Sequence, residues 1–180
     1  MNCDPLEKKR IFLIGYRGTG KTTIGRILAE MLEYAFLDTD QMVEKKYAMT
    51  ISMIVEQKGW DVFRQMEKQA LLTALDVENC VIATGGGIVI DPENILLVKS
   101  SGCVVWLNAP VAVIVSRISR DMKSADTRPC FTDNHLEEET CFVLGQRISL
   151  YRQAADFEIN TSLDNAADTA EKIKRRIYGR

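Results

Sequence analysis

The chain is 180 residues long, which is typical of a single domain with a proper hydrophobic core. Its hydrophobic content of 46% and charged content of 27% are ordinary for a soluble globular protein. The net charge of −2 gives no sign of a nucleic-acid partner. We therefore interpret individual positive residues as parts of an anion-binding site.

The cysteines and the apolar segments indicate the compartment. Five cysteines, odd in number and without a C-x-x-C pair, argue against a disulfide framework and against a zinc site. Reduced thiols in a cytosol are the simpler account. The apolar runs are too short for a signal peptide or for the roughly 20 residues of a membrane span. We therefore expect a cytoplasmic protein with no membrane partner. The absence of a long exposed apolar helix favours a monomer.

Apolar runs and helical patterns alternate along the chain. Strands are predicted at 11–15, 35–38, 80–84, 103–107 and 156–160. Helices are predicted at 21–33, 40–47, 50–57, 60–76, 92–99, 110–119, 136–153 and 164–178. Strands that alternate with helices pair in parallel through right-handed crossovers. We expect one α/β domain, residues 1–180, in which helices cover both faces of a five-stranded parallel sheet. Ligands of such sheets bind beyond the carboxyl ends of the strands.

The most informative motif is G-Y-R-G-T-G-K-T at residues 15–22, directly after an apolar strand and before a helix. It matches the P-loop pattern G-x-x-x-x-G-K-[ST]. Glycines let the backbone aim N–H groups at phosphate oxygens, and the helix adds its positive N-terminal end. Lys21 is placed to bind the β- and γ-phosphates and Thr22 to ligate Mg²⁺. The sequence thus predicts a P-loop NTPase domain whose nucleotide site includes Gly15, Gly18, Thr19, Gly20, Lys21, Thr22 and Thr23.

Two aspartates, Asp38 and Asp40, lie at the end of the second predicted strand. Residues i and i+2 of an extended segment point the same way, so both can face the P-loop. Asp38 would help to hold hydrated Mg²⁺, and Asp40 would bind or deprotonate an acceptor hydroxyl. Alternatively, Asp40 only caps the next helix, since Asp is a favoured cap.

Three consecutive glycines, Gly85, Gly86 and Gly87, follow the third predicted strand. Their entropic cost makes a plain turn a poor explanation, and they suit a ligand that lies against bare backbone N–H groups.

Four arginines stand at informative places: Arg64, Arg117, Arg128 and Arg147. Glu67, one helical turn after Arg64, is placed to hold its guanidinium. Each arginine alone is more often a solvated surface residue, whereas a cluster would indicate an anionic acceptor. Arg128 lies in a long polar segment, about 120–135, whose length and two arginines favour a lid.

Taken in order, these motifs resemble the shikimate kinase family over nearly the whole chain. The resemblance rests on the P-loop, the D-T-D at 38–40, the F-R-x-x-E at 63–67, the glycines, the R-P at 128–129 and Arg147 before L-Y at 150–151. It implies transfer of the γ-phosphoryl of ATP to the 3-hydroxyl of shikimate, in chorismate and aromatic amino-acid biosynthesis.

The resemblance also implies roles for the matching residues. Lys21 and Arg128 would stabilise the transferring phosphoryl group, and Asp40 would bind hydroxyls of the acceptor. Thr22 and Asp38 would hold Mg²⁺. Arg117 would stack on adenine, opposite a wall formed by residues 159–161 and the Asn165 region. The acceptor site, in the region of about 40–70 and beyond, would comprise Asp40, Arg64, Glu67, Gly85, Gly86, Gly87 and Arg147.

The chain departs from the family pattern beside the site, with Cys130-Phe131 after the R-P pair and Ser149 before L-Y. Two other functions remain open at this stage. One is a P-loop kinase that acts on gluconate or a nucleoside monophosphate, and the other is a non-catalytic nucleotide-binding module that regulates a partner.

Overall fold

The structure, a computed structural model, describes residues 9–121 and 136–179. Its centre is a five-stranded sheet in the order β2-β3-β1-β4-β5, with every pair parallel. The strands are β1 (Arg10–Ile14), β2 (Ala35–Asp38), β3 (Cys80–Ala83), β4 (Cys103–Asn108) and β5 (Phe157–Asn160). The predicted α/β class and the five-stranded parallel sheet are confirmed.

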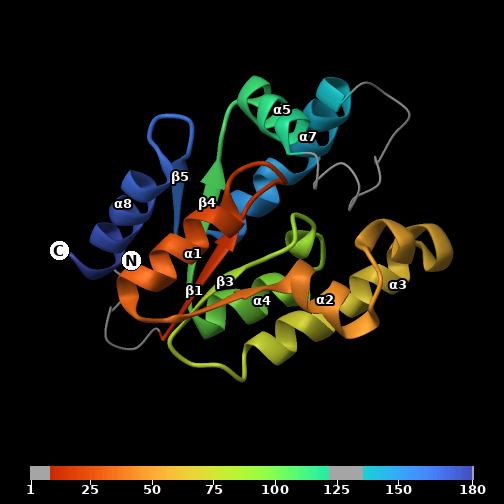
Figure 1. Ribbon diagram of the computed structural model, residues 1–180, viewed down its shortest axis with the longest axis horizontal. Coiled ribbons are helices and arrows are strands. Elements are labelled where there is room, and N and C mark those ends of the chain that lie inside the picture. Colours follow the sequence, from red (N-terminus) through yellow and green to blue (C-terminus); the bar gives the residue numbers. More distant parts are fainter. Residues whose placement is uncertain (1–8, 122–135, 180) are drawn as a thin grey trace.

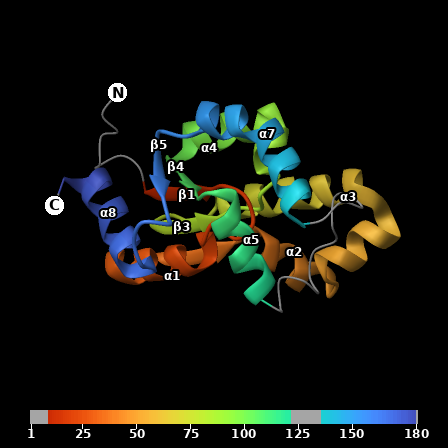
Figure 2. The same cartoon turned by 90° about the horizontal axis from the view of Figure 1, so that it is seen from above.

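Helices cover both faces of this sheet (Figure 1). They are α1 (Lys21–Leu32), α2 (Thr39–Tyr47), α3 (Ile51–Ala74), α4 (Pro92–Ser101), α5 (Val111–Arg120), α7 (Leu136–Ala154) and α8 (Ala166–Tyr178), with a short 3₁₀ helix η1 (Ile88–Ile90). Figure 2 shows α1 and α8 on one side of the sheet and α4 and α7 on the other. Among the described residues, no helix combines the length and the apolar character that crossing a bilayer requires.

Side chains of β1 alternate between the two layers of core. Ile11 and Leu13 pack with the apolar residues of α1 and α8. Phe12 and Ile14 belong to the larger cluster that involves α3, α4, α5 and α7. Successive residues of a strand point to opposite faces, so one short apolar run supplies both cores. The domain is therefore a three-layer sandwich around the strand that precedes the P-loop.

A third, smaller cluster forms where α2 packs against both parts of α3, and these two helices lie beside the sheet (Figure 1). Two separate helices were predicted here, at 50–57 and 60–76. The structure has the predicted interruption: α3 consists of two helical parts that meet at Gly59, where the backbone is not helical and the axis is kinked. Gly59 has φ +83°, a conformation that residues with a Cβ rarely adopt. The kink lets the two parts of α3 run in different directions.

The strand ends place three of the predicted motifs on one edge of the sheet. The P-loop follows β1, Asp38 ends β2 and the glycines follow β3. Thr84 ties two of these segments together, because its backbone N–H and its hydroxyl both donate to the carbonyl of Leu13, at 3.1 and 3.2 Å. The predicted lid lies outside the described residues, except for Arg120 and Asp121, and remains a prediction.

Candidate functional site

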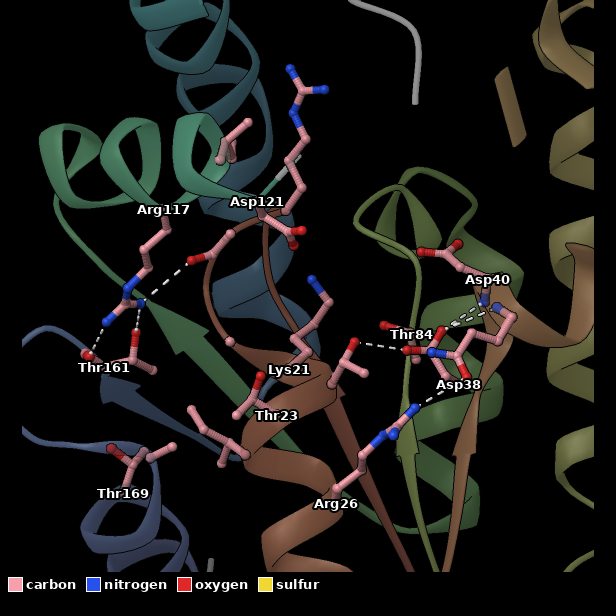
Figure 3. A pocket seen from close by; sticks show the side chains of 18 of the residues that line it. Lys21, Thr23, Arg26, Asp38, Asp40, Thr84, Arg117, Asp121, Thr161 and Thr169 are labelled. Carbon is pink, nitrogen blue, oxygen red and sulfur yellow. Dashed lines mark hydrogen bonds between the residues drawn. The ribbon is translucent and has the colours of Figure 1, made fainter. Parts of the chain in front are cut away.

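An open cleft of about 720 Å³ lies over the carboxyl ends of the strands. Its walls come from the P-loop, the first turn of α1, the start of α2, the end of α5 and the start of α8 (Figure 3). Seven residues of the P-loop and of the start of α1 were predicted to bind the nucleotide. Five of them line the cleft: Gly18, Gly20, Lys21, Thr22 and Thr23.

Glycine conformation sets the path of the P-loop. Gly15, Gly18 and Gly20 have φ of +139°, +76° and +91°. A Cβ on Gly15 would also collide with the carbonyl oxygen of Leu107. The loop ends at Gly20, which caps α1 without a side-chain hydrogen bond, so the helix presents its first N–H groups to the cleft. This is the arrangement that binds phosphate in P-loop proteins.

Lys21 is nearly buried and crosses back over the loop. Its ammonium donates to the carbonyls of Gly15 and Tyr16, both at 2.8 Å. The other predicted loop residue, Thr19, is also buried and donates from its hydroxyl to Tyr16 at 2.7 Å. Gly15 and Thr19 therefore shape the loop, while Lys21 lies in the cleft wall.

Thr22 and Asp38 form one unit at the cleft floor. The Thr22 hydroxyl donates to Oδ2 of Asp38 at 2.8 Å. The other oxygen of Asp38 accepts the backbone N–H groups of Asp40 and Gln41, at 3.1 and 3.3 Å, and so caps α2. A hydroxyl and a carboxylate fixed side by side are hard oxygen ligands of the kind that Mg²⁺ prefers. The pair fits the predicted metal site.

Asp40 does not follow the extended geometry predicted for it. It belongs to the first turn of α2, and the capping role that was the alternative for Asp40 belongs to Asp38. Figure 3 shows the two carboxylates pointing in different directions. Oδ1 of Asp40 lies near Gly85, 2.7 Å from where a Cβ of that residue would stand. Asp40 is thus directed toward the glycine loop.

Arg117 bridges two loops at the opposite end of the cleft. Its guanidinium donates to the hydroxyl and the carbonyl of Thr161, at 2.8 and 2.6 Å, and to the carbonyl of Gly18 at 3.4 Å. Asn165 caps α8 by accepting the N–H of Asp168 at 2.9 Å. The cleft wall beside it is formed by Asp164, Ala166 and Thr169. A direct contact of Asn165 with a nucleotide stays a prediction.

A second, narrow cavity of about 30 Å³ adjoins the cleft. It lies between the P-loop, α3, the glycine loop and α7, and it shares Arg17, Asp40 and Ile51 with the cleft. Six of the seven predicted acceptor residues line it, namely Asp40, Arg64, Glu67, Gly86, Gly87 and Arg147, together with Tyr16, Trp60 and Phe63, whereas the seventh, Gly85, is not part of its lining. The structure therefore brings the predicted acceptor residues together, next to the cleft.

Arg64 and Glu67 form the predicted pair, with Nη1 of the arginine 2.5 Å from Oε2 of the glutamate. The guanidinium also lies 5.3 Å from the ring centre of Trp60 and 5.2 Å from that of Phe63. Glu67 is only 1% exposed. Burial raises the pKa of the Glu67 carboxyl, although the charges of Arg64, Arg147 and Lys21 act in the opposite direction.

The glycine loop is packed against side chains of the acceptor cavity. A Cβ on Gly85 would collide with Oε1 of Glu67, and one on Gly87 would collide with the guanidinium of Arg64. The carbonyl of Gly86 accepts hydrogen bonds from Arg147 at 3.3 Å and from the Tyr151 hydroxyl at 2.5 Å. The glycines thus let two charged side chains approach the backbone, a reason that the sequence argument did not contain.

Comparison with known proteins decides the family. The family model described as shikimate kinase matches residues 17–178. The chain belongs to the shikimate kinase family.

Individual relatives agree with this assignment. The chain is 40% identical to shikimate kinase of Syntrophus aciditrophicus, over 95% of this chain and 92% of the relative. It is 39% identical to shikimate kinase of Caldicellulosiruptor bescii, over 92% and 93%. A solved structure of shikimate kinase from Acinetobacter baumannii in complex with shikimate superposes with a TM-score of 0.90, at 36% identity, over 96% of this chain and 94% of that one.

Three residues of this kinase site were not singled out by sequence reasoning: Arg17, Glu139 and Tyr151. Arg17 occupies a variable position of the P-loop motif, and Glu139 is one of three consecutive glutamates. Tyr151 entered only as part of the L-Y pair. The predicted catalytic Arg128 lies outside the described residues, and its role stays a prediction.

Replacement of Gly85 with alanine tests the fit of the glycine loop in this kinase. The added Cβ displaces Glu67 or Asp40, and a displacement of about 1 Å near the chemistry costs on the order of 100-fold in rate. We expect Gly85→Ala to lower kcat/KM for the acceptor by about 10–100-fold, measured by ADP release. Gly145→Ala is the control, because its Cβ meets nothing within 4 Å and activity stays at the wild-type level. Unchanged activity of Gly85→Ala would contradict the packing argument.

Replacement of Glu67 with glutamine tests the electrostatics of its burial. In the unfolded chain the Glu67 carboxyl loses its proton near pH 4.5, and in the folded protein it loses the proton at higher pH because its pKa is raised. Wild-type stability therefore falls relative to Glu67→Gln as pH rises through this window. We expect urea unfolding at several pH values to show that trend in the difference between the two proteins. A difference of opposite sign would mean that pairing with Arg64 outweighs burial.

Proposed function

We propose that this chain transfers the γ-phosphoryl group of ATP to the 3-hydroxyl of shikimate, a step of chorismate biosynthesis. Membership of the shikimate kinase family supports the reaction. The observation that carries the assignment of residues is the junction of the two cavities, where Asp40 lines both. A hydroxyl bound by Asp40 in the narrow cavity faces the cleft that holds the P-loop.

The narrow cavity suits an acceptor with a carboxylate and several hydroxyls. Arg64 and Arg147 line it and present guanidinium groups, which bind carboxylates through paired hydrogen bonds. Glu67 fixes Arg64 from behind, and the carbonyl of Gly86 holds Arg147. In this proposal the arginines bind the carboxylate of shikimate and Asp40 binds the attacking hydroxyl. Gly85, Gly86 and Gly87 supply the backbone wall.

The cleft suits the triphosphate and the base of the nucleotide. The P-loop N–H groups and the N-terminus of α1 bind phosphate oxygens, and Lys21 stabilises charge on the transferring group. Thr22 and Asp38 would hold Mg²⁺, which neutralises charge on the phosphate oxygens when bound. Arg117, fixed by Thr161, lies where it can pack against the base. Arg128 completes the phosphate site in this proposal.

Reaction then depends mainly on position and charge. A loose phosphoryl transition state needs the attacking and leaving oxygens in line and its charge neutralised, with little covalent chemistry from the protein. Asp40 orients the hydroxyl and accepts its proton as its oxygen bonds to the γ-phosphorus, while the bond from that phosphorus to the bridging oxygen breaks and ADP leaves. Exclusion of water from the joined cavities prevents hydrolysis of ATP.

An ADP-release assay with ATP and Mg²⁺ tests the acceptor. The panel contains shikimate, quinate, gluconate and nucleoside monophosphates, and Lys21→Met serves as the background control with a rate at least about 100-fold lower. We expect saturable turnover with shikimate alone. Turnover with gluconate or a nucleotide would retain the P-loop site and overturn the acceptor assignment. Nucleotide binding without turnover on any compound would favour the non-catalytic module.

We also propose that the protein works as a monomer in the cytoplasm, with ATP and shikimate as its partners and no nucleic acid or membrane. Cys80 is a buried free thiol and Cys141 is an exposed one, which agrees with a reducing compartment. Sedimentation equilibrium should give a mass close to the 20.3 kDa of one chain, and a mass of twice that value would contradict the monomer.

A further inference from the structure

Arg17 has a distinctive position in the P-loop. Within residues 9–121 and 136–179, it is one of three residues that line both the cleft and the narrow cavity, and the other two are Asp40 and Ile51. Of these three, Arg17 carries the positive charge and Asp40 the negative one. Its backbone N lies against Gly86, 3.5 Å from where a Cβ of that glycine would stand. Arg17 is thus located where the P-loop and the glycine loop meet.

The Arg17 side chain is held by a partner that is 122 residues away in the sequence. Its Nη2 donates to Oε1 of Glu139 on α7 at 2.6 Å. The arginine side chain is 6% exposed and the glutamate side chain 0%. The guanidinium also lies 5.7 Å from the ring centre of the buried Tyr16. These contacts fix the guanidinium of a residue that lines both cavities against Glu139 of α7 and against Tyr16.

Stability alone is a poor explanation for this ion pair. Removing two charges from water costs several kcal/mol per ion, and replacing such a pair by apolar residues is often neutral or stabilising. The second carboxylate oxygen of Glu139, Oε2, is buried and accepts no hydrogen bond within the described parts of the chain. An incompletely satisfied buried carboxylate is more readily explained by the orientation it gives to a functional partner.

The proposed reaction explains why the Arg17 guanidinium needs a fixed orientation. It brings together two anions, the terminal phosphate of ATP and the carboxylate-bearing acceptor, which repel each other in a site of low dielectric constant. Lys21 lines only the cleft, and Arg64 and Arg147 line only the narrow cavity. A cation that borders both cavities reduces the repulsion between the two ligands.

We propose that Arg17 is a further substrate-contacting residue, whose guanidinium faces both the terminal phosphate and the acceptor, and that Glu139 is the positioning residue that holds it there. This inference rests on the proposed function. It has a specific consequence: Arg17 contributes to the coupling between the two ligands, so that each binds more tightly when the other is present.

The test measures this coupling directly. Calorimetry gives the dissociation constant of shikimate with and without a non-hydrolysable ATP analogue and Mg²⁺, and the ratio of the two constants is the coupling factor. We expect Arg17→Met to reduce the coupling factor by about tenfold, while shikimate affinity without nucleotide changes much less. We expect Glu139→Gln to reduce it in the same direction, by a smaller factor. The control is Glu138→Gln, an exposed neighbour on the same turn of α7, with the wild-type coupling factor.

Two further measurements keep the inference falsifiable. Arg17→Met leaves Glu139 buried without its partner, so the double variant Arg17→Met/Glu139→Met, which removes both charges, is measured as well. An unchanged coupling factor in a folded single or double variant overturns the inference. So does an equal loss of shikimate affinity with and without nucleotide, because a purely structural role would have that effect.

Failure of the proposed function gives a different pattern. In that case the wild-type protein does not bind or phosphorylate shikimate. The role of Arg17 is then decided by the affinities of the protein for the ATP analogue and for ADP. If Arg17 faces the terminal phosphate, Arg17→Met weakens the binding of the ATP analogue about tenfold more than the binding of ADP. Equal weakening of both nucleotides overturns the inference whatever the acceptor is.

Discussion

The close approach of the glycine loop to the P-loop is the constraint on which the site depends. Parallel pairing of β1 and β3 brings Leu13 opposite Ala83, so the segments that follow both strands start side by side. Thr84 then bonds back to Leu13, and Gly86 packs against the P-loop backbone. A Cβ on Gly86 would stand 3.4 Å from the carbonyl oxygen of Gly15, at ordinary van der Waals distance, so the two backbones lie side by side there. Of the described residues, Arg17, Asp40 and Ile51 are common to the walls of the cleft and of the narrow cavity, which meet at this junction.

The glycine loop also organises the acceptor cavity from its other side. Because Gly85 and Gly87 have no side chains, Glu67 and Arg64 can lie against the backbone of the loop. The carbonyl of Gly86 accepts hydrogen bonds from Arg147 and Tyr151. Burial raises the pKa of the Tyr151 hydroxyl, which therefore stays protonated and remains a donor. Tyr151 in turn stacks on Trp106 of β4, with ring centres 5.8 Å apart. The position of Arg147 is thus linked, through one carbonyl and one aromatic pair, to the centre of the sheet.

Sequence reasoning predicted the parts of this site whose chemistry is local. The P-loop, the Arg64–Glu67 pair and the strand-end position of Asp38 each depend on a few neighbouring residues, and periodicity was enough for the sheet and most helices. It was wrong about the direction of Asp40, because the helix begins one residue earlier than predicted and Asp38 provides the cap. It missed the partnership of Arg17 with Glu139, since no short pattern links residues in different elements of the fold.

Two arginines at the acceptor cavity are held in the same way. Arg64 bonds to Glu67 and Arg17 to Glu139, and each carboxylate is buried and uses one oxygen for its arginine. The other oxygen, Oε1 of Glu67 or Oε2 of Glu139, has no hydrogen bond to the described residues. A guanidinium has five N–H donors in a rigid fork, so one carboxylate is enough to fix its orientation. The desolvation cost of both glutamates is consistent with arginines oriented before the anions arrive.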